Sequence, residues 1–308
     1  MANTKEIQKR MKSIKDTMKI TNAMYMISST KLQKAKRKLA ATEPYFYSIQ
    51  QSFQRILRHT PDLDSIYFKD TDHLAKEDKK VGYIVVTADK GMAGAYNHNV
   101  IKIAHDLLEE NSQNRFFVLG ELGRQYFARE GLKVDTHFHY TVQDPSLHRA
   151  RMITDTMIDL YQKGELDEIY IIYTRMENSM SAVAEMRKLL PLSKRTFTTA
   201  APIDVYQEEL KADPSWDRIV ELLVPNYVNG FIYGALVESY ASEHNSRMMA
   251  MQSATDSARQ ILNQLSIQYN RVRQAAITQE ITEVIGGAKA LKRKKQTVDS
   301  KKGKGICL

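Results

Sequence analysis

The feature that most constrains this chain is where it lacks glycine and proline. Neither residue occurs in 1–43 or in 235–285 of the 308-residue sequence. Because glycine and proline are the strongest helix breakers, each stretch can form one uninterrupted helix. A helix over 235–285 would be about 77 Å long at 1.5 Å per residue, which exceeds the width of a domain of this size. We therefore expect part of it to extend beyond a globular body.

Both stretches also carry a seam of apolar and small residues at spacings that alternate between three and four. This is the heptad repeat of a left-handed coiled coil. Alanine is frequent and a few polar residues interrupt the seams, so little area would be buried. The competing interpretation is two amphipathic helices that lie on one globular core. The N-terminal seam comprises Ile7, Met11, Ile14, Met18, Thr21, Tyr25, Ser28, Leu32, Ala35 and Leu39, and the C-terminal seam Met251, Ala254, Ala258, Ile261, Leu265, Gln268, Val272 and Ala275.

The middle of the chain alternates strand and helix patterns. Apolar runs at 81–88, 116–120 and 168–173 predict strands, and the patterns at 100–108, 121–130 and 146–163 predict helices. Such alternation is typical of a mostly parallel α/β sheet, to which 180–206 would add a strand pair. The expected fold class is α/β: a long antiparallel coiled coil of N- and C-terminal helices plus a central Rossmann-like domain. The expected ranges are 1–60 for the first helix, 78–210 for the α/β domain, 215–291 for the second helix and 292–308 for a basic tail.

The glycine-containing segment DKGMAGAYN (89–97) follows the first predicted strand. A phosphate-binding loop would need G-x-x-x-x-G-K-[ST], and a dinucleotide-binding turn would need G-x-G-x-x-G. Neither pattern is present. We therefore interpret the segment as a tight strand-to-helix turn and expect no cofactor.

Candidate catalytic and metal sites are weak. His137 and His139 are two apart, which by itself is a weak metal signal, so a solvated strand edge or loop is favoured over a metal site. No H-E-x-x-H or G-x-S-x-G motif occurs. The single cysteine, Cys307, excludes an intramolecular disulfide. We expect no active site of the chain's own.

The net charge of +9 is unevenly distributed. Residues 1–40 hold 11 basic against 2 acidic residues and residues 289–308 hold 8 against 1, so the body between them is mildly acidic. Basic ends attract acidic partners of any class, nucleic acid, membrane surface or protein. No apolar run is long enough to predict a membrane span, and no secretory signal is seen.

Several blocks together resemble one family. IQKRMKSIKDTMKITNAMYMISSTKLQKAK (7–36) and RQAAITQEITEVIGGAKAL (273–291) resemble the terminal helices of the γ subunits of F-type ATP synthases. VGYIVVTADKGMAGAYN (81–97) and ENSMSAVAEMRKLLPL (177–192) resemble that family's α/β domain. The blocks occur in the family's order from about residue 3 to 291.

The resemblance implies a central-stalk rotor of bacterial type that couples ion flow through a membrane ring to ATP synthesis or hydrolysis at β subunits by rotation. The implied partners are three α and three β subunits around one γ, the ε subunit and the membrane c-ring, with no nucleic acid and no insertion into the membrane. The implied location is the cytoplasmic face of the bacterial membrane. The family's Rossmann-like domain binds no nucleotide, so the non-catalytic subunit needs no cofactor. Whether protons or sodium ions drive rotation is decided in the ring.

The resemblance also assigns roles to individual residues. Arg273 and Gln274 match positions that hydrogen-bond a loop of one β subunit, whereas by themselves they would be solvated helical residues. Lys9, Arg10 and Lys12 would form an electrostatic track past acidic β segments. The positions that match coupling residues near the β contacts are Met24, Arg247, Thr278 and Glu280.

The tail KRKKQTVDSKKGKGICL (292–308) departs from the family pattern, and its composition predicts disorder. Two other functions compete with the rotor. A coiled-coil nucleic-acid-binding protein would fit the pI near 9.3, although no aromatic residues interleave with the basic runs. A nucleotide-dependent α/β enzyme would require ATP or NAD binding, for which no motif is present.

Overall fold

The structure is a computed structural model that describes residues 4–302 apart from 61–62, 70, 72–74, 76–77, 111–112, 133, 136–137, 179–180, 195–196, 198–210 and 214. The chain forms two compact units. We call Met24–Met251 the α/β unit, and Met1–Ala23 with Gln252–Leu308 the helical unit. The long helices α1 (Thr4–His59) and α6 (Trp216–Lys302) contribute residues to both units.

The α/β unit is built on a four-stranded sheet. Its strands are β1 (Val81–Val86), β2 (Arg115–Leu119), β3 (Glu168–Met176) and β4 (Ala182–Leu190), in the order β2-β1-β3-β4. The first three are parallel, and β4 pairs antiparallel with β3. Of the strand pair predicted over 180–206, β4 is the strand observed among the described residues, and most of 195–206 lies outside them. All six residues of β1 are buried, as expected for a central parallel strand that is covered on both faces.

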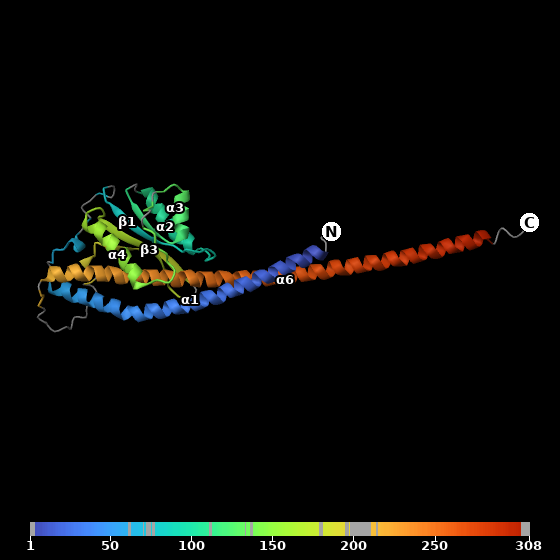
Figure 1. The fold of residues 1–308 in the computed structure, drawn as a ribbon, viewed down its shortest axis with the longest axis horizontal. Helices are drawn as coiled ribbons and strands as arrows, with labels where there is room; N and C mark the ends of the chain where they lie inside the picture. The colour runs from blue at the N-terminus through green and yellow to red at the C-terminus, as the bar shows by residue number, and fades with distance from the viewer. Residues whose placement is uncertain are drawn as a thin grey trace, which may run out of the picture. The chain divides into compact units, whose positions relative to one another are not determined.

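Helices cover both faces of this sheet (Figure 1). Helices α2 (Tyr96–Glu110) and α3 (Glu121–Arg129) pack on one face, where Val85, Phe116 and Phe127 share a core. Helix α4 (Leu147–Gln162) and the long helices pack on the other face, where the larger core includes Ile84 and Ile171. Helix α4 begins at the N-cap Ser146, whose side chain accepts from the Arg149 amide. A single 3-10 turn, η1 (Ile66–Phe68), precedes β1.

Glycine is required where β2 turns into α3. Gly120 has φ +90, and a Cβ built there would lie 2.2 Å from the carbonyl oxygen of Thr87. Thr87 Oγ1 in turn donates to the Leu119 carbonyl at 2.7 Å and accepts from the Gly123 amide at 3.1 Å. This close approach fixes β1 against the start of α3, so a larger residue at 120 would force the two apart.

Each long helix continues through an interior proline. Pro44 lies inside α1 and Pro225 inside α6, although an interior proline costs roughly 3 kcal/mol by removing a hydrogen bond and crowding the preceding turn. Aromatic packing within the α/β unit offsets this cost. Phe46 stacks on Tyr227 at 5.4 Å between ring centroids, and Phe53 packs against Tyr227 at 5.6 Å. The Asn226 side chain also donates to the Leu222 carbonyl beside Pro225.

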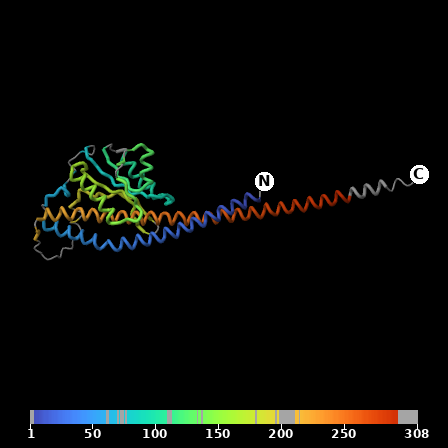
Figure 2. The backbone as a smooth tube through the Cα atoms, in the orientation of Figure 1, coloured from blue at the N-terminus to red at the C-terminus, as the bar shows by residue number. Residues whose placement is uncertain are grey.

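Within each unit α1 and α6 pair in opposite directions (Figure 2). In the helical unit Gln8 bonds Tyr269 at 2.9 Å and Thr21 bonds Thr255 at 2.7 Å, so partner numbers in α6 fall as those in α1 rise. The predicted N-terminal seam is confirmed, because each of its ten residues is buried or half-buried. The antiparallel pair, the mostly parallel α/β sheet and the predicted fold class are thus observed.

The predicted C-terminal seam is partly wrong. Ala254, Ile261 and Gln268 are exposed, whereas Thr255, Leu262 and Tyr269 face inward. The other predicted residues Met251, Ala258, Leu265 and Val272 are buried or half-buried as expected, and Ala275 is exposed. The inward residues therefore still alternate by four and three, and three of them lie one position later than predicted. Hydropathy misled the assignment, because Thr255 and Tyr269 face α1 through their hydroxyl groups.

Two further expectations need correction. Helix α6 runs to Lys302 without a break at Gly286 or Gly287, so the first part of the predicted disordered tail 292–308 is helical, which its lysine-rich composition permits. Residues 303–308 lie outside the described residues.

The second expectation is that no apolar run is long enough to predict a membrane span. One 18-residue window within Trp216–Lys292 reaches a mean hydropathy of 1.2, a value that a membrane span would also give, and 39% of this window is buried. Core helices pass the same test, and Val220, Val224 and Val228 of this helix lie in the core of the α/β unit.

Candidate functional site

The residues singled out from the sequence fall into two groups. Met24 and Arg247 belong to the α/β unit, whereas the other seven belong to the helical unit. We name the first group, with its surroundings, the junction site, because it lies where α6 meets the turn after β1. Each group is described within its own unit.

Arg247 is the centre of the junction site. It is only 6% exposed, and its guanidinium bonds the turn after β1. Nη2 donates to the Lys90 carbonyl at 2.8 Å and to the Gly91 carbonyl at 3.1 Å, and Nε donates to the Gly91 carbonyl at 3.2 Å. The predicted tight turn at 89–97 therefore presents carbonyl oxygens to a cation from α6. A phosphate-binding loop would instead present amide hydrogens to an anion.

One turn earlier on α6, Glu243 neutralises this arginine. Its Oε1 lies 2.6 Å from Arg247 Nη2, and both side chains are 7% exposed. Burial raises the pKa of the Glu243 carboxyl, and the charge and hydrogen bond of Arg247 oppose that rise. The pair follows the i,i+4 spacing of a helical Glu–Arg pair. This spacing was visible in the sequence, but nothing there indicated that the pair was buried.

His244 completes the polar cluster. Its Nδ1 lies 3.2 Å from Arg247 Nη1, and its ring packs edge-on against Tyr240 at 4.4 Å between centroids. Burial, followed by the positive charges of Arg247 and Lys31, lowers the pKa of the imidazole to about 3. A neutral imidazole therefore accepts from the guanidinium and adds no second charge to the cluster.

Met24 lies beside this cluster on α1. It lines a cavity of about 190 Å³ together with Arg247, Glu243 and the turn residues Gly91 and Met92. The structure thus brings together the two sequence-predicted residues of the α/β unit. Met24 is half-buried, and Met92, with φ 62, is 63% exposed.

Asp89 anchors the other side of the turn, and sequence reasoning missed it. Its Oδ1 accepts from the Glu121 amide at 3.1 Å, while Oδ2 accepts from the Val142 amide at 3.2 Å and from the Thr141 hydroxyl. Asp144, two residues after Val142, forms an ion pair with Lys38 of α1, with 2.6 Å between Asp144 Oδ1 and Lys38 Nζ. The turn and the 141–144 loop are therefore tied to both long helices through charged groups within the α/β unit.

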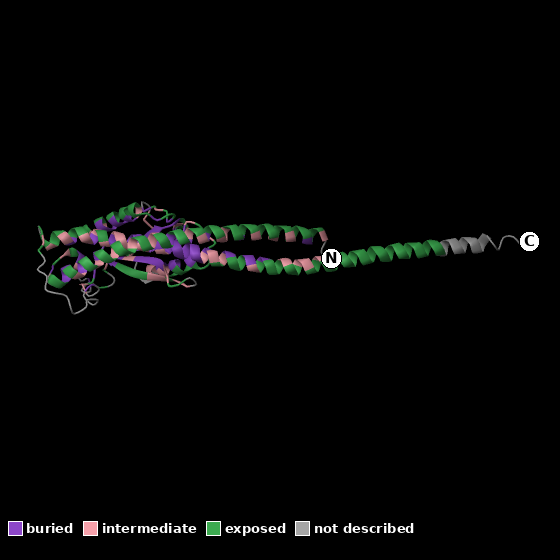
Figure 3. Cartoon of the chain, turned by 90° about the horizontal axis from the view of Figure 1, so that it is seen from below, coloured by how far each residue is buried: buried purple, intermediate pink, exposed green. Residues whose placement is uncertain are grey.

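The remaining predicted residues lie on exposed helix surfaces of the helical unit. Every residue from 273 to 292 is exposed, which includes Arg273, Gln274 and Glu280, and α6 is correspondingly green in Figure 3 up to the segment drawn in grey. Thr278 is exposed as well, and its Oγ1 donates to the Gln274 carbonyl at 2.9 Å. On α1 the predicted track of Lys9, Arg10 and Lys12 is also exposed.

Among the described residues these groups are not accompanied by a built metal site. In the part of the chain that the structure describes, no three His, Cys, Asp or Glu residues gather closely enough to hold a metal ion. His139 is described, whereas His137, the other half of the weak histidine pair, lies outside the described residues.

Comparison with known proteins identifies the chain's relatives. Residues 3–291 match a family model described as ATP synthase. The "ATP synthase gamma chain" of Ruminiclostridium cellulolyticum is 42% identical over 292 residues, which cover 94% of this chain and 99% of the relative. The "ATP synthase gamma chain, sodium ion specific" of Acetobacterium woodii is 34% identical over 303 residues, with coverages of 94% and 99%.

A solved structure agrees at the level of the fold. A chain in the central stalk and c-ring structure of the Tetrahymena thermophila mitochondrial ATP synthase aligns with a TM-score of 0.57 at 24% identity, covering 76% of this chain and 99% of that one. The family match and the bacterial relatives extend over nearly the whole length of both partners. The chain belongs to the ATP synthase γ-chain family.

Proposed function

We propose that this chain is the central-stalk rotor subunit of the catalytic sector of an ATP synthase. It couples ion flow through the membrane ring to ATP synthesis or hydrolysis at the β subunits by rotation. Membership of the γ-chain family and the long antiparallel helix pair support this role. ATP chemistry takes place on the β subunits, and this chain contributes no catalytic group.

The observation that carries the proposal is the exposed surface of α6 from 273 to 292. Its apolar residues Ile277, Ile281 and Val284 are between 45% and 72% exposed. Apolar side chains on successive turns of a bare helix favour a partner that surrounds the helix. A ring of three α and three β subunits supplies such a surface, and an asymmetric helix inside a threefold ring gives each β site a different set of contacts. A shaft biases a site only through such differential contacts.

The site residues of the helical unit take their roles from this arrangement. Arg273 and Gln274 hydrogen-bond a loop of one β subunit, and Thr278 and Glu280 contribute coupling contacts nearby. Lys9, Arg10 and Lys12 pass acidic β segments. All seven residues are exposed and available to a partner.

The junction site supports coupling from within the chain. Arg247 is buried and bonds the turn after β1, so its contribution is to hold α6 against the α/β domain. Met24 shares the adjoining cavity. We propose further that the ε subunit and the c-ring bind the α/β domain end of the rotor, at the cytoplasmic face of the bacterial membrane, with no segment inserted into the bilayer.

The proposal is tested by reconstitution of the full chain with the α and β subunits of the same organism. We expect one copy per α3β3 ring and multi-site ATPase activity only when the chain is present. A chain that remains monomeric beside its partners and leaves their activity unchanged would overturn the rotor function. Salt-sensitive DNA binding in its place would instead support the basic coiled-coil alternative.

The site assignment is tested with Arg273→Ala in the reconstituted complex. Loss of a hydrogen bond to a charged group costs about 1.5–3 kcal/mol, which corresponds to a turnover roughly tenfold lower or more. Arg259→Ala is the matched control, because Arg259 is an exposed arginine on the same helix that pairs with Asp256 within one turn. If both variants assemble and turn over alike, the β contact is not made by Arg273.

A further inference from the structure

A second cavity of the α/β unit lies away from the junction site. Its volume is about 510 Å³, within the range of small-molecule sites, and it opens between α1 and α6 beside the sheet. Aromatic side chains form much of its wall. Phe231 packs edge-on against both Phe46 and Tyr173, at 6.2 and 6.3 Å between ring centroids. The other aromatic residues that line it are Tyr45 and Tyr233.

Two glycines of α6 line this cavity, one helical turn apart. A Cβ added at Gly230 would meet the Phe46 ring at 3.1 Å, whereas one added at Gly234 would meet no atom within 4 Å. Glycine in a helix interior is destabilising relative to alanine. Close packing against Phe46 accounts for Gly230. At Gly234 the missing side chain leaves open volume in the cavity and satisfies no packing requirement.

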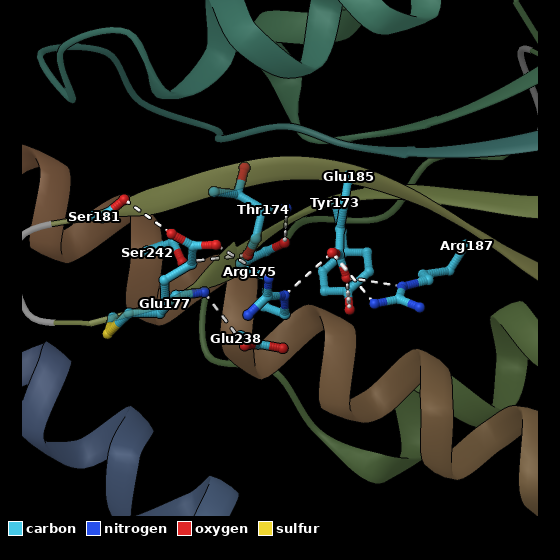
Figure 4. Close-up of polar contacts among 11 residues, drawn as sticks. Tyr173, Thr174, Arg175, Glu177, Ser181, Glu185, Arg187, Glu238 and Ser242 are labelled. Atoms are coloured by element: carbon cyan, nitrogen blue, oxygen red, sulfur yellow. Dashed lines mark hydrogen bonds and ion pairs between the residues drawn. The ribbon is translucent and has the colours of Figure 1, made fainter.

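The charged residues on the described lining are both acids, Glu43 and Glu238. Glu238 is half-buried, and one of its oxygens accepts from the Met176 amide at 3.3 Å (Figure 4). Among the described residues, no lysine, arginine or histidine nitrogen forms an ion pair with it. The nearby Arg175 is instead bonded to Glu185 at 3.1 Å and to Glu177 at 3.4 Å. A carboxylate without an ion-pair partner on an apolar wall is costly unless a cation joins it.

We propose that this cavity is a binding site for a hydrophobic monovalent ammonium ion. The ammonium group pairs with the Glu238 carboxylate, and the apolar body occupies the space above Gly234 between the aromatic rings. Aromatic faces attract cations as well as apolar groups. The two charged side chains that line the cavity, Glu43 and Glu238, are negative and so attract an ammonium ion. Burial also raises the pKa of the Glu238 carboxyl, and the Met176 amide and the charges of Arg175 and Arg187 oppose this rise without cancelling it. The site does not depend on the rotor function.

The test is a titration of the full chain with 4-phenylbutylammonium and with its neutral analogue 4-phenylbutanol, followed by calorimetry. We expect the ammonium ion to bind at least tenfold more tightly than the alcohol. Glu238→Gln should abolish this preference by weakening the ammonium ion alone. Glu221→Gln is the control, since it removes another α6 carboxylate that lies outside this cavity and pairs with Arg218.

Gly234→Leu provides a second, independent variant. The open space at this position accepts a side chain, so the helix should be retained and the cavity filled. Both probes should then bind more than tenfold more weakly, with far-ultraviolet circular dichroism unchanged. Equal affinity of the wild-type chain for the two probes would overturn the proposal. So would an ammonium preference that survives Glu238→Gln, or binding that is unaffected by Gly234→Leu.

Discussion

Replacement of Arg247 by alanine should destabilise the α/β unit by far more than loss of a surface arginine. The guanidinium lies 2.6 Å from Glu243, and both side chains are 7% exposed. Removing one member of a buried pair costs about 3–5 kcal/mol, because the other charge is left uncompensated. The Lys90 and Gly91 carbonyls also lose their donor, but the adjoining cavity of about 190 Å³ can admit water to them. We therefore expect a loss near the lower end, about 3 kcal/mol.

The stability lost on Arg247→Ala should depend on pH, in a direction set by the ionisation of Glu243. Burial raises the pKa of this carboxyl, and Arg247 opposes the rise, so Arg247→Ala should raise the folded-state pKa further. The native state then binds a proton more tightly than the unfolded chain. Stability is consequently retained below the unfolded pKa of about 4.3 and falls as the pH rises through the folded value. The penalty of Arg247→Ala should therefore be larger at pH 8 than at pH 5.

The assay is urea unfolding followed by the fluorescence of Trp216, the single tryptophan of the chain, which packs against the core of the α/β unit. Arg218→Ala is the matched control, because Arg218 forms an exposed ion pair on the same helix, and it should cost less than about 1 kcal/mol. Adding Glu243→Gln to Arg247→Ala should recover stability and flatten the pH dependence. A loss below 1 kcal/mol, equal at pH 5 and pH 8, would refute the reasoning.

Two further predictions concern other buried polar groups. Burial would raise the pKa of the Glu168 carboxyl, but hydrogen bonds to the carboxylate, the largest from Thr71, outweigh burial and lower the pKa to about 2. Acid titration followed by Trp216 fluorescence should therefore show stability lost between pH 4.5 and 2. Glu168→Gln should remove this pH dependence. In the helical unit Thr21→Val should cost about 1 kcal/mol through loss of its bond to Thr255, and the Thr21→Val, Thr255→Val double variant should cost less than the sum of the singles in thermal circular dichroism.

Local patterns were sufficient to predict most of the elements. Strands β1, β2 and β3 follow apolar runs, because a parallel sheet buries both faces of its strands. The inward face of α1 follows hydropathy, since its seam is apolar apart from Thr21 and Ser28. The face of α6 could not be assigned in this way. There the inward positions include Thr255 and Tyr269, which are recognised only once their partners on α1 are known.

The sequence predicted only part of the junction site, because the contacts of the site join residues that are distant in the sequence. Met24 and Arg247 were named from the family resemblance, which attributes coupling to them without stating what each side chain touches. Arg247 donates to main-chain carbonyls that are more than 150 residues away in the sequence. Because every residue has such a carbonyl, the amino-acid sequence does not reveal which ones accept these hydrogen bonds. The i,i+4 spacing alone predicts that Glu243 pairs with Arg247 on the same helix. The burial that makes this ion pair important for stability depends on the turn after β1, which the spacing does not reveal.

The two units differ in the charged groups proposed to serve coupling, and the difference fits the mechanics of a rotor. The α/β unit contains buried charged pairs, Glu243–Arg247 and Glu168 with Lys79, beside its exposed ones. Such contacts resist displacement, because separating them exposes an uncompensated charge in a poor solvent. In the helical unit the cations Lys9, Arg10 and Arg273 are exposed, and exposed ion pairs are worth little to any one partner. In the proposed function the rotor releases each β subunit in turn, so weak, exchangeable charges would suit the surface that passes these partners, whereas strong, buried charges would suit the contact between α6 and the turn after β1.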